Sequence, residues 1–429
     1  MTVYTSTKVM ILEEYYIDKI LEIGEKRGFE VDIYISKSES LNCELDGDSL
    51  DSFQEDRDFG VGVRVLKEGR VGFAYSTGEG VDVIYRAMEN LVPDRYTSIP
   101  EPKRDVPDPK GIFHREVLEI GEETLLEDLN TMKDILEDGG ITVTGGSVER
   151  SYIYTRVVNS KGLDVEEEFT YYSASISGIR DGETAYDYLS RTYRFNVEKL
   201  GEYVRDILSL PKSVKMSYSG KILLTPRVLN SLLAYTLLPS FSAENVQRNR
   251  SILKGEIGEE VMGEYITIID DGTVDEGLYS SKVDGEGVPR RRTVLVENGI
   301  LKGYLYDIKR ANREGKESTG NGVRDYDTLP TISPSNVIIT PVDKLDNYNE
   351  YLQVNEIIGC HTSNPITGDF SVEISNSYIV KNGERIPVKK GMLSGNIFEI
   401  LKNAIPMDDV SQRGRLISPS LMIEGRIVV

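Results

Sequence analysis

The chain has 429 residues, of which 39% are hydrophobic and 28% are charged. This composition is typical of a globular protein of two or three domains and excludes a disordered chain. Its 50 basic and 71 acidic side chains leave a formal net charge of −21, which argues against direct DNA binding because such binding needs Lys and Arg at the phosphates. The only basic cluster in the sequence is "PRRRT" at 289–293.

Two cysteines, Cys43 and Cys360, are too few for a disulfide framework and are typical of a reducing compartment. The sequence also has no run of about twenty apolar residues, the length that crosses a bilayer. The N-terminus soon reaches acidic residues such as Glu13 and Glu14, which a signal peptide would not contain there. We therefore expect a cytoplasmic protein without a membrane span.

The first ninety residues alternate helix and strand patterns. Apolar residues recur at helical spacing from Met10 to Lys26, and Gly28 predicts the helix end. Two strand-like runs follow, "FEVDIYISKSES" and "SLNCELDGDSLDSFQED", and then "FGVGVRVLKEGRVGFAYST" predicts a hairpin with "KEGR" at its turn. Residues 79–91 predict an amphipathic helix.

Five prolines between residues 93 and 111 predict an exposed connection. A helix is predicted at 122–138, followed by a strand meander with a turn at Gly162, and by a helix near 196–209. These patterns predict an N-terminal α/β domain at 1–215, in which neighbouring strands of the sheet are antiparallel.

The second half begins with a predicted helix at Thr225-Pro226, where a hydroxyl residue precedes a proline in the first turn. Beyond Ser251, short strand patterns alternate with glycine turns, and Asn-Gly pairs in "VENGI" (296–300) and "VKNGE" (380–384) predict hairpins. We predict a β-rich C-terminal domain at 218–429, so that the whole chain is α+β.

Three phrases in the second half are more specific than any periodicity. They are "DGEGVPRRRTVLVENGILKGYLYD" (284–307), "STGNG" (318–322) and "NPITGDFS" (364–371). Together they resemble the C-terminal half of the TldD/PmbA family, which includes the proteins called modulators of DNA gyrase. The resemblance implies a zinc metallopeptidase scaffold, in which catalytic members carry a His-Glu-x-x-x-His helix and a cysteine ligand near the C-terminus.

This sequence departs from the catalytic pattern at all three ligand positions. It has two histidines, His114 and His361, and neither lies in such a helix. Aligning "SILKGEIGEEV" (251–261) with the family places the metal slot at 234–239, which reads "AYTLLP", and Arg413-Gly414 stand where Cys-Gly is expected. The resemblance therefore points to the PmbA/TldE branch, with no metal or other cofactor in this chain and zinc in its partner.

We assign no catalytic residue. The resemblance makes the following residues candidates for a peptide cleft: Ser318, Thr319, Gly320, Asn321, Gly322, His361 and Asn364. Tight turns are the alternative for the glycine-rich phrases, because glycine tolerates positive φ. The acidic residues Asp270, Asp271, Asp284 and Glu286 are expected in exposed turns rather than around a cation. Cys360 and His361 are adjacent, so on a strand they would point to opposite faces.

The function that the resemblance implies is that of a non-catalytic subunit. It would pair with a TldD-type metallopeptidase, help to hold unfolded peptides for cleavage and be inactive without that partner. One alternative is a homodimeric peptide-binding or scaffold protein without peptidase activity. Another is a hydrolase with its own site around His361.

Overall fold

The computed structural model describes residues 3–78, 80–342 and 348–428, with side chains from Glu14 onward. Its N-terminal half is one seven-stranded sheet in the order β4-β3-β2-β1-β5-β6-β7, and every neighbouring pair is antiparallel. The strands are β1 (Glu30–Asp46), β2 (Ser49–Lys67), β3 (Arg70–Ser76), β4 (Val92–Pro93), β5 (Thr142–Asn159), β6 (Asp164–Arg180) and β7 (Glu183–Arg191). The predicted antiparallel sheet is confirmed.

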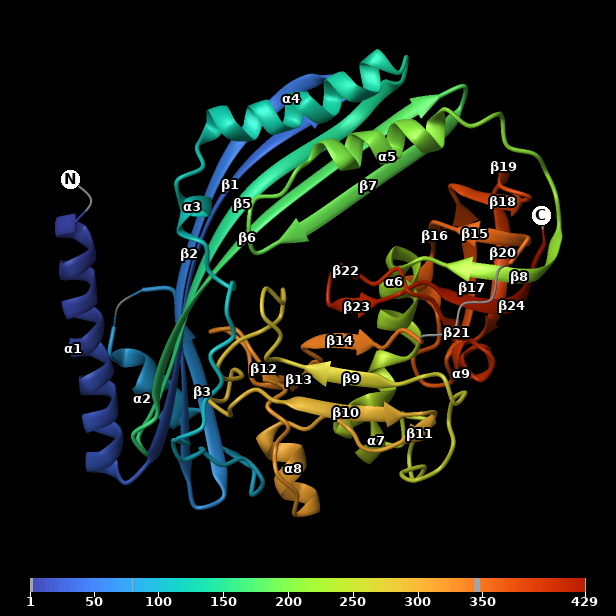
Figure 1. Cartoon of the computed structure of the whole chain (residues 1–429). Helices are drawn as coiled ribbons and strands as arrows, with labels where there is room; N and C mark the ends of the chain where they lie inside the picture. The colour runs from blue at the N-terminus through green and yellow to red at the C-terminus, as the bar shows by residue number, and fades with distance from the viewer. Residues whose placement is uncertain (1–2, 79, 343–347, 429) are drawn as a thin grey trace.

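Strand alternation gives this sheet two different faces. Ile33, Ile35 and Cys43 of β1 point outward into apolar cores, whereas Asp32 and Tyr34 point to the opposite, inner face. The outer face is covered by helices at both ends, as Figure 1 shows. These helices are α1 (Val3–Arg27) and α2 (Asp82–Glu89) at one end, and α3 (Arg115–Leu118), α4 (Glu122–Asp138) and α5 (Glu198–Leu208) at the other.

The C-terminal half packs beneath the inner face, so that the long sheet arches over it (Figure 1). One of its sheets has the order β11-β10-β9-β14-β23-β22, and a larger one has the order β16-β17-β20-β24-β8-β15-β18-β19, with β21 beside β24. The strands of the first sheet are β9 (Ile268–Asp271), β10 (Arg292–Glu297), β11 (Ile300–Leu301), β14 (Asn336–Ile339), β22 (Ser411–Arg413) and β23 (Leu416–Ser418). β12 (Gly322–Val323) and β13 (Thr331–Ile332) form a separate pair.

The larger sheet and six short helical segments complete the described part of this half. Its strands are β8 (Tyr218–Leu224), β15 (Glu350–Val354), β16 (Glu356–Ile358), β17 (Asp369–Ser375), β18 (Ser377–Lys381), β19 (Glu384–Val388), β20 (Gly391–Asn396), β21 (Ile405–Pro406) and β24 (Leu421–Val428). The α-helices are α6 (Pro226–Thr236), α7 (Ala243–Gln247), α8 (Ile308–Glu314) and α9 (Ile397–Leu401), and the 3-10 turns are η1 (Leu238–Phe241) and η2 (Cys360–Thr362). The predicted α+β class is confirmed.

Local sequence signals explain several turns. The three predicted hairpin turns contain Glu68-Gly69, Asn298-Gly299 and Asn382-Gly383, and all six residues have positive φ, as the tight turn between twisted strands requires.

Within the described residues, no helix has both the length and the apolar character to cross a bilayer.

The sheet and the C-terminal half approach closely at Tyr326, next to two glycines of β2. A Cβ at Gly60 would lie 2.1 Å from the ring of Tyr326, and one at Gly62 would lie 2.2 Å from its backbone oxygen. The tyrosine hydroxyl donates to Asp58 at 3.2 Å. These glycines allow the loop to lie flat on the inner face.

We expect Gly62→Ala to lower the free energy of unfolding by about 1–3 kcal/mol, because the added methyl group meets a backbone carbonyl and not a movable side-chain tip. Urea unfolding would measure the change. Gly78→Ala is the matched control, since a Cβ there meets nothing within 4 Å. Equal unfolding midpoints for the two variants would contradict this account of the junction.

Candidate functional site

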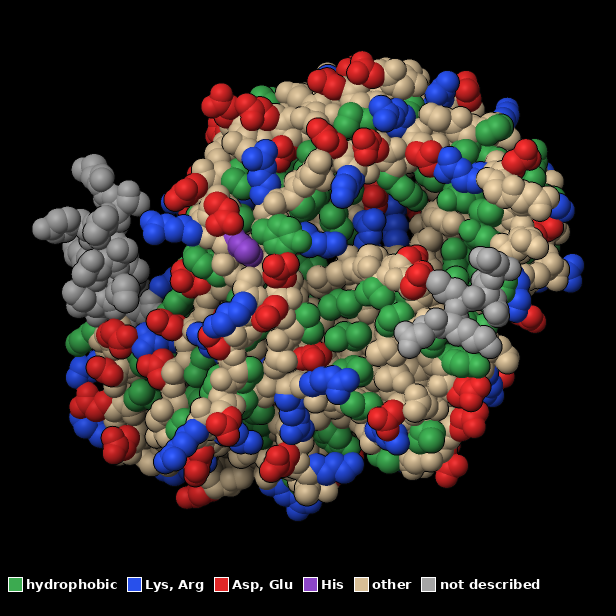
Figure 2. Space-filling model, viewed as in Figure 1, with side chains coloured by type: hydrophobic (Ala, Val, Ile, Leu, Met, Phe, Trp, Pro, Cys, Tyr) green, Lys and Arg blue, Asp and Glu red, His purple; other side chains and the backbone are tan. Residues whose placement is uncertain are grey.

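A hollow lies between β7 and the C-terminal half, and Lys or Arg side chains are visible within it in Figure 2. Three elements bring arginines to this place: the end of β7 carries Arg191, α6 carries Arg227, and β22 carries Arg413. Because β7 is an edge strand of its sheet, its outward backbone carbonyls need other partners. The arginines supply them.

Each of the three guanidinium groups bonds a carbonyl of this edge. Arg227 Nη1 donates to Tyr186 O at 2.6 Å, and Arg413 Nη1 donates to Tyr188 O at 2.5 Å. Arg191 Nη1 donates to Ser190 O at 2.8 Å and to Gln412 O, beside Arg413, at 3.2 Å. Arginine is suited to this arrangement because its guanidinium presents several donors in a fixed plane.

Asp187 lies at the centre of the arginines and is 3% exposed. Its Oδ1 atom accepts from Arg227 at 3.0 Å, from Arg413 at 3.1 Å and from the Tyr188 amide at 2.9 Å. A second carboxylate, Glu356, lies 3.6 Å from Arg227 Nη2, and burial raises its pKa. Two of the three guanidinium groups, those of Arg227 and Arg413, therefore share Asp187, and Arg227 also pairs with Glu356.

Aromatic rings complete the walls of the hollow. Tyr186 and Tyr188 are stacked with their centroids 5.7 Å apart, and the Arg227 guanidinium lies 5.1 and 5.5 Å from the two ring centres. Contacts of this kind hold the arginine by cation–π attraction while its charge stays in a partly dry environment. Burial and, more weakly, the charge of Arg413 lower the pKa of Arg191.

The predicted metal slot borders the same hollow. A Cβ at Gly414 would lie 3.0 Å from the Asn230 side chain of α6, and Ala234, which is exposed, is one turn further along that helix face. The slot and the Arg413-Gly414 pair, 180 residues apart in sequence, are thus neighbours in space. Across the described residues, no three His, Cys, Asp or Glu side chains are grouped so that they could hold a metal ion.

The predicted start of α6 at Pro226 is confirmed, but Thr225 does not cap it with its side chain. The hydroxyl instead donates to Val354 O at 3.2 Å. This bond ties the helix start to β15, so that the hydroxyl serves tertiary packing rather than the first turn.

The predicted cleft residues of "STGNG" lie inside the C-terminal half, and their polar groups are engaged there. Thr319 Oγ1 accepts from the Tyr306 amide at 2.7 Å, and Asn321 Nδ2 donates to Asp270 Oδ2 at 2.8 Å. Thr319, Gly320, Asn321 and Gly322 are buried, and Ser318 is partly buried with its hydroxyl on Tyr306 O. Their contribution to a peptide cleft stays a prediction.

Close backbone approach explains the two glycines of this loop. Gly320 has a φ of +75°, and a Cβ there would lie 2.6 Å from Pro289 O. A Cβ at Gly322 would lie 2.4 Å from Glu286 Oε2. The loop thus presses against the "DGEGVPRRRT" segment, whose Arg290 donates to Gly320 O at 2.6 Å. The first arginine of the "PRRRT" cluster points inward.

The remaining candidates lie on the loop between β16 and β17. His361 is exposed and lies in η2, whereas the neighbouring Cys360 is 6% exposed, and burial raises the pKa of its thiol to about 11. Asn364 Oδ1 accepts from the amides of Ile366 and Thr367, which closes a turn. The other histidine, His114, contacts Gly111 O and Glu116 instead.

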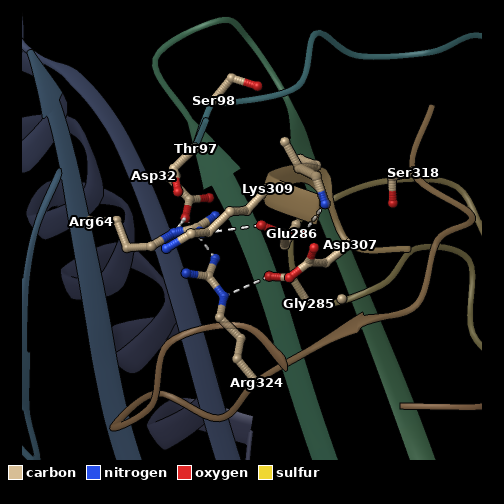
Figure 3. Close-up of polar contacts among 12 residues, drawn as sticks. Asp32, Arg64, Thr97, Ser98, Gly285, Glu286, Asp307, Lys309, Ser318 and Arg324 are labelled. Carbon is tan, nitrogen blue, oxygen red and sulfur yellow. Dashed lines mark hydrogen bonds and ion pairs between the residues drawn. The ribbon is translucent and has the colours of Figure 1, made fainter. Parts of the chain in front are cut away.

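A buried charge network joins the sheet to the C-terminal half (Figure 3). Arg64 of β2 donates to Asp32 Oδ2 at 2.7 Å and to Glu286 Oε1 at 3.2 Å. Arg324 Nη2 lies 2.8 Å from Asp32 Oδ2, an ion pair without the angle of a hydrogen bond, and its Nε donates to Gly285 O at 2.6 Å. All four charged side chains are at most 2% exposed.

The expectation that the acidic residues of the second half form exposed turns is wrong. Asp270, Asp284 and Glu286 are 1–2% exposed, and Asp271 is 9% exposed. Asp284 accepts from the amides of Glu286, Val288 and Gly322, so its carboxylate holds two loops together. Burial, with the nearby charge of Glu286, raises the pKa of Asp284.

A cavity of about 210 Å³ adjoins this network and is lined by charged groups of both signs. Lys309 pairs with Asp94 at 2.7 Å, and Arg310 pairs with Asp307 at 2.6 Å. Burial, and then the charge of Glu286, raises the pKa of Asp307 to about 6. A larger cavity, about 380 Å³, lies between α1 and the sheet and is mainly apolar. The first cavity is balanced in charge, and the lining of the second combines aliphatic and aromatic side chains with a few charged ones.

The arched sheet, the β-rich half and the hollow between them define a metallopeptidase-like scaffold of the PmbA/TldD type. Family models match residues 31–92 (PmbA/TldA metallopeptidase domain 1), 110–209 (the central domain) and 217–428 (the C-terminal domain). The chain belongs to the PmbA/TldD family. The boundary between the first two models falls on the proline-rich connection, and strands β1 and β5 join these two parts into one sheet.

Individual relatives agree with this assignment. An uncharacterized protein of Methanocaldococcus jannaschii is 54% identical over 96% of this chain and 99% of its own length. The crystal structure of TldE from Thermococcus kodakarensis is similar with a TM-score of 0.88 and 26% identity, covering 96% of this chain and all of that one. The crystal structure of a candidate modulator of DNA gyrase from Thermotoga maritima is similar with a TM-score of 0.90 and 26% identity. The match covers 97% of this chain and 100% of that one.

The charge network gives a stability prediction. Arg64→Met keeps the side-chain length but leaves Glu286 without its guanidinium partner and weakens the pairing of Asp32, so we expect a loss of about 3–5 kcal/mol in the free energy of unfolding. Arg57→Met on the same strand is the control, because Arg57 is 69% exposed and its ion pairs are worth less than about 1 kcal/mol. Equal losses from the two substitutions would contradict the role of the network.

Glu167 of β6 gives a pH prediction. It is buried and accepts from the amides of Lys282 and Val283, and burial raises its pKa to about 7. Between about pH 4 and pH 7 the folded state therefore holds a proton that the unfolded state has lost, so stability falls as the pH rises through this range.

Thermal unfolding between pH 5 and pH 8 tests this sign. We expect the wild-type protein to lose about 1–3 kcal/mol more than Glu167→Gln over that interval, since Gln cannot ionise. Glu202→Gln, on the exposed side of α5, should retain the wild-type slope. A Glu167→Gln slope equal to that of the wild type would show that Glu167 titrates normally.

Proposed function

We propose that this chain is the non-catalytic, PmbA/TldE-like subunit of a TldD/TldE-type metallopeptidase that acts on unfolded peptides in the cytoplasm. The observation that carries the proposal is the composition of the hollow. The face of α6 next to β22 presents Asn230 and Ala234, and the facing strand presents Arg413-Gly414. Hydrolytic zinc needs imidazole, carboxylate or thiolate ligands, and these positions hold none.

The same positions favour a substrate-holding role. Zinc, and the water that it would activate, are assigned to the partner subunit. This chain contributes the arched sheet, the hollow under its edge and the arginines along that edge. The similarity to the protein called TldE supports this division of labour, and the metallopeptidase description of the family supports the reaction class.

Any link to DNA gyrase would then act through proteolysis. The net charge of −21 opposes contact with DNA. The described basic side chains that gather in the hollow are tied to an edge strand and two carboxylates, so they do not form an open stripe that follows a phosphate backbone.

The test is to measure zinc content and cleavage of a flexible peptide for the purified chain, for a TldD-type chain from the same cell, and for their mixture. We expect the purified chain alone to be inactive and to lack stoichiometric zinc, and the mixture to cleave the peptide and to elute as one complex. A mixture whose partner has Gln in place of the motif Glu is the control, because it keeps the interface but loses the general base.

Zinc binding or cleavage by the chain alone would overturn the proposal. Activity that is lost in His361→Ala would instead indicate a hydrolase centred on that exposed histidine. A stable homodimer that binds the peptide, does not cleave it and ignores the TldD-type chain would identify a scaffold protein.

A further inference from the structure

The arginines of the hollow have more donors than the protein uses. Among the contacts of the described residues, Arg413 uses only Nη1, which donates to Tyr188 O and Asp187. Arg191 uses Nη1 for Ser190 O and Gln412 O, and its guanidinium also interacts with the Tyr193 side chain. The other nitrogens of Arg413 have no hydrogen-bond partner among the described residues, and they are not sealed from solvent, since its side chain is 22% exposed.

Charge in the hollow is also uneven. Asp187 is shared by Arg227 and Arg413, and Glu356 lies beside Arg227. Arg191 is partly buried, is repelled by the charge of Arg413 and is attracted by that of Glu276, but it forms no ion pair with a carboxylate in the described part of the chain. Because a partly buried cation without a directly paired counter-charge is costly, this place favours an anion supplied from outside.

The geometry of the anchors suits a carboxylate. Bonds to backbone carbonyls hold the Nη1 side of both guanidinium groups, which fixes their planes and leaves further N–H groups for a ligand. Carboxylates match such a fork with two charge-assisted hydrogen bonds. The stacked Tyr186 and Tyr188 rings lie alongside and would cover the apolar part of a peptide residue.

We propose that Arg191 and Arg413 bind a carboxylate group of an extended peptide, either its C-terminal carboxylate or an Asp or Glu side chain. This inference rests on the proposed function of holding peptides, and it adds a chemical preference. The net charge of −21 would repel acidic peptides from most of the surface, so the arginine pair gives them one favourable place, under the edge of the sheet.

Fluorescence anisotropy of the purified full chain tests the preference without any partner. Three labelled peptides share one uncharged sequence: one ends in a free carboxylate, one is amidated, and one is amidated but contains a single Asp. We expect the free-carboxylate peptide to bind at least about tenfold more tightly than the neutral amide, because charge-assisted bonds to Arg are lost in the amide. Tight binding of the Asp peptide would identify any carboxylate as sufficient, and weak binding would restrict the site to the chain end.

Arg191→Gln and Arg413→Gln should each weaken binding of the carboxylate peptide about tenfold and leave binding of the neutral amide unchanged. Arg426→Gln is the control for net charge, since Arg426 is exposed on β24. Arg191→Gln also tests the site without breaking a buried ion pair, because Arg191 pairs with no carboxylate among the described residues. Its effect on binding is therefore separable from a loss of folding. Raising the salt concentration should reduce the preference for the carboxylate peptide.

Equal affinity for the acid and the amide, absence of peptide binding, or equal loss for both peptides in the variants would overturn the inference. Such a result together with cleavage by the two-chain mixture would reject the carboxylate site and leave the proposed function standing. Carboxylate-dependent binding without cleavage by the mixture would reject the partner-subunit function and leave the site standing.

Discussion

The position of the sheet over the C-terminal half depends on one buried interaction, the network of Asp32, Arg64, Glu286 and Arg324. Two of these charges come from adjacent strands of the sheet, and two come from loops of the other half. A charge that is buried without a partner costs several kcal/mol, and although Asp32 and Arg64 pair within the sheet, Glu286 pairs with Arg64 and Arg324 pairs with Asp32 only across the junction. The two halves must therefore meet in the register that pairs all four.

This network also positions what lies around it. Glu286 Oε2 accepts from the Ile308 amide at 2.9 Å, at the start of α8, where Asp307 caps the helix by accepting from the Arg310 amide. The same segment presses on Gly322 of the "STGNG" loop. Two of the three phrases that resemble the family, at 284–307 and 318–322, thus lie at or beside the junction of the two halves. Their glycines and carboxylates are explained by packing and charge pairing before any contact with substrate is invoked.

The sequence predicts the elements that depend on local physics. The amphipathic pattern at 122–138 matches α4 residue for residue, and the Asn-Gly pairs are hairpin turns. It misses α8, although Asp307 and Gly315 are a readable cap and stop. It also misplaces Asp284 and Glu286, because "DGEG" has the composition of an exposed turn, and only the loop's approach to β2 buries it. The sequence identifies Arg413 only through the family resemblance and does not predict that it lies with Arg191 and Arg227, since these three positions carry no shared local pattern.

The hollow links these observations to the chemistry of the family. A zinc site brings positive charge to the place where a peptide is held and cleaved. In this chain the neighbouring positions carry guanidinium groups, which place positive charge there. An arginine side chain is a poor general base near neutral pH, because it stays protonated there. The arginines of the hollow supply positive charge that suits attraction and orientation of a peptide, and under the proposed function hydrolysis falls to a partner subunit with a metal.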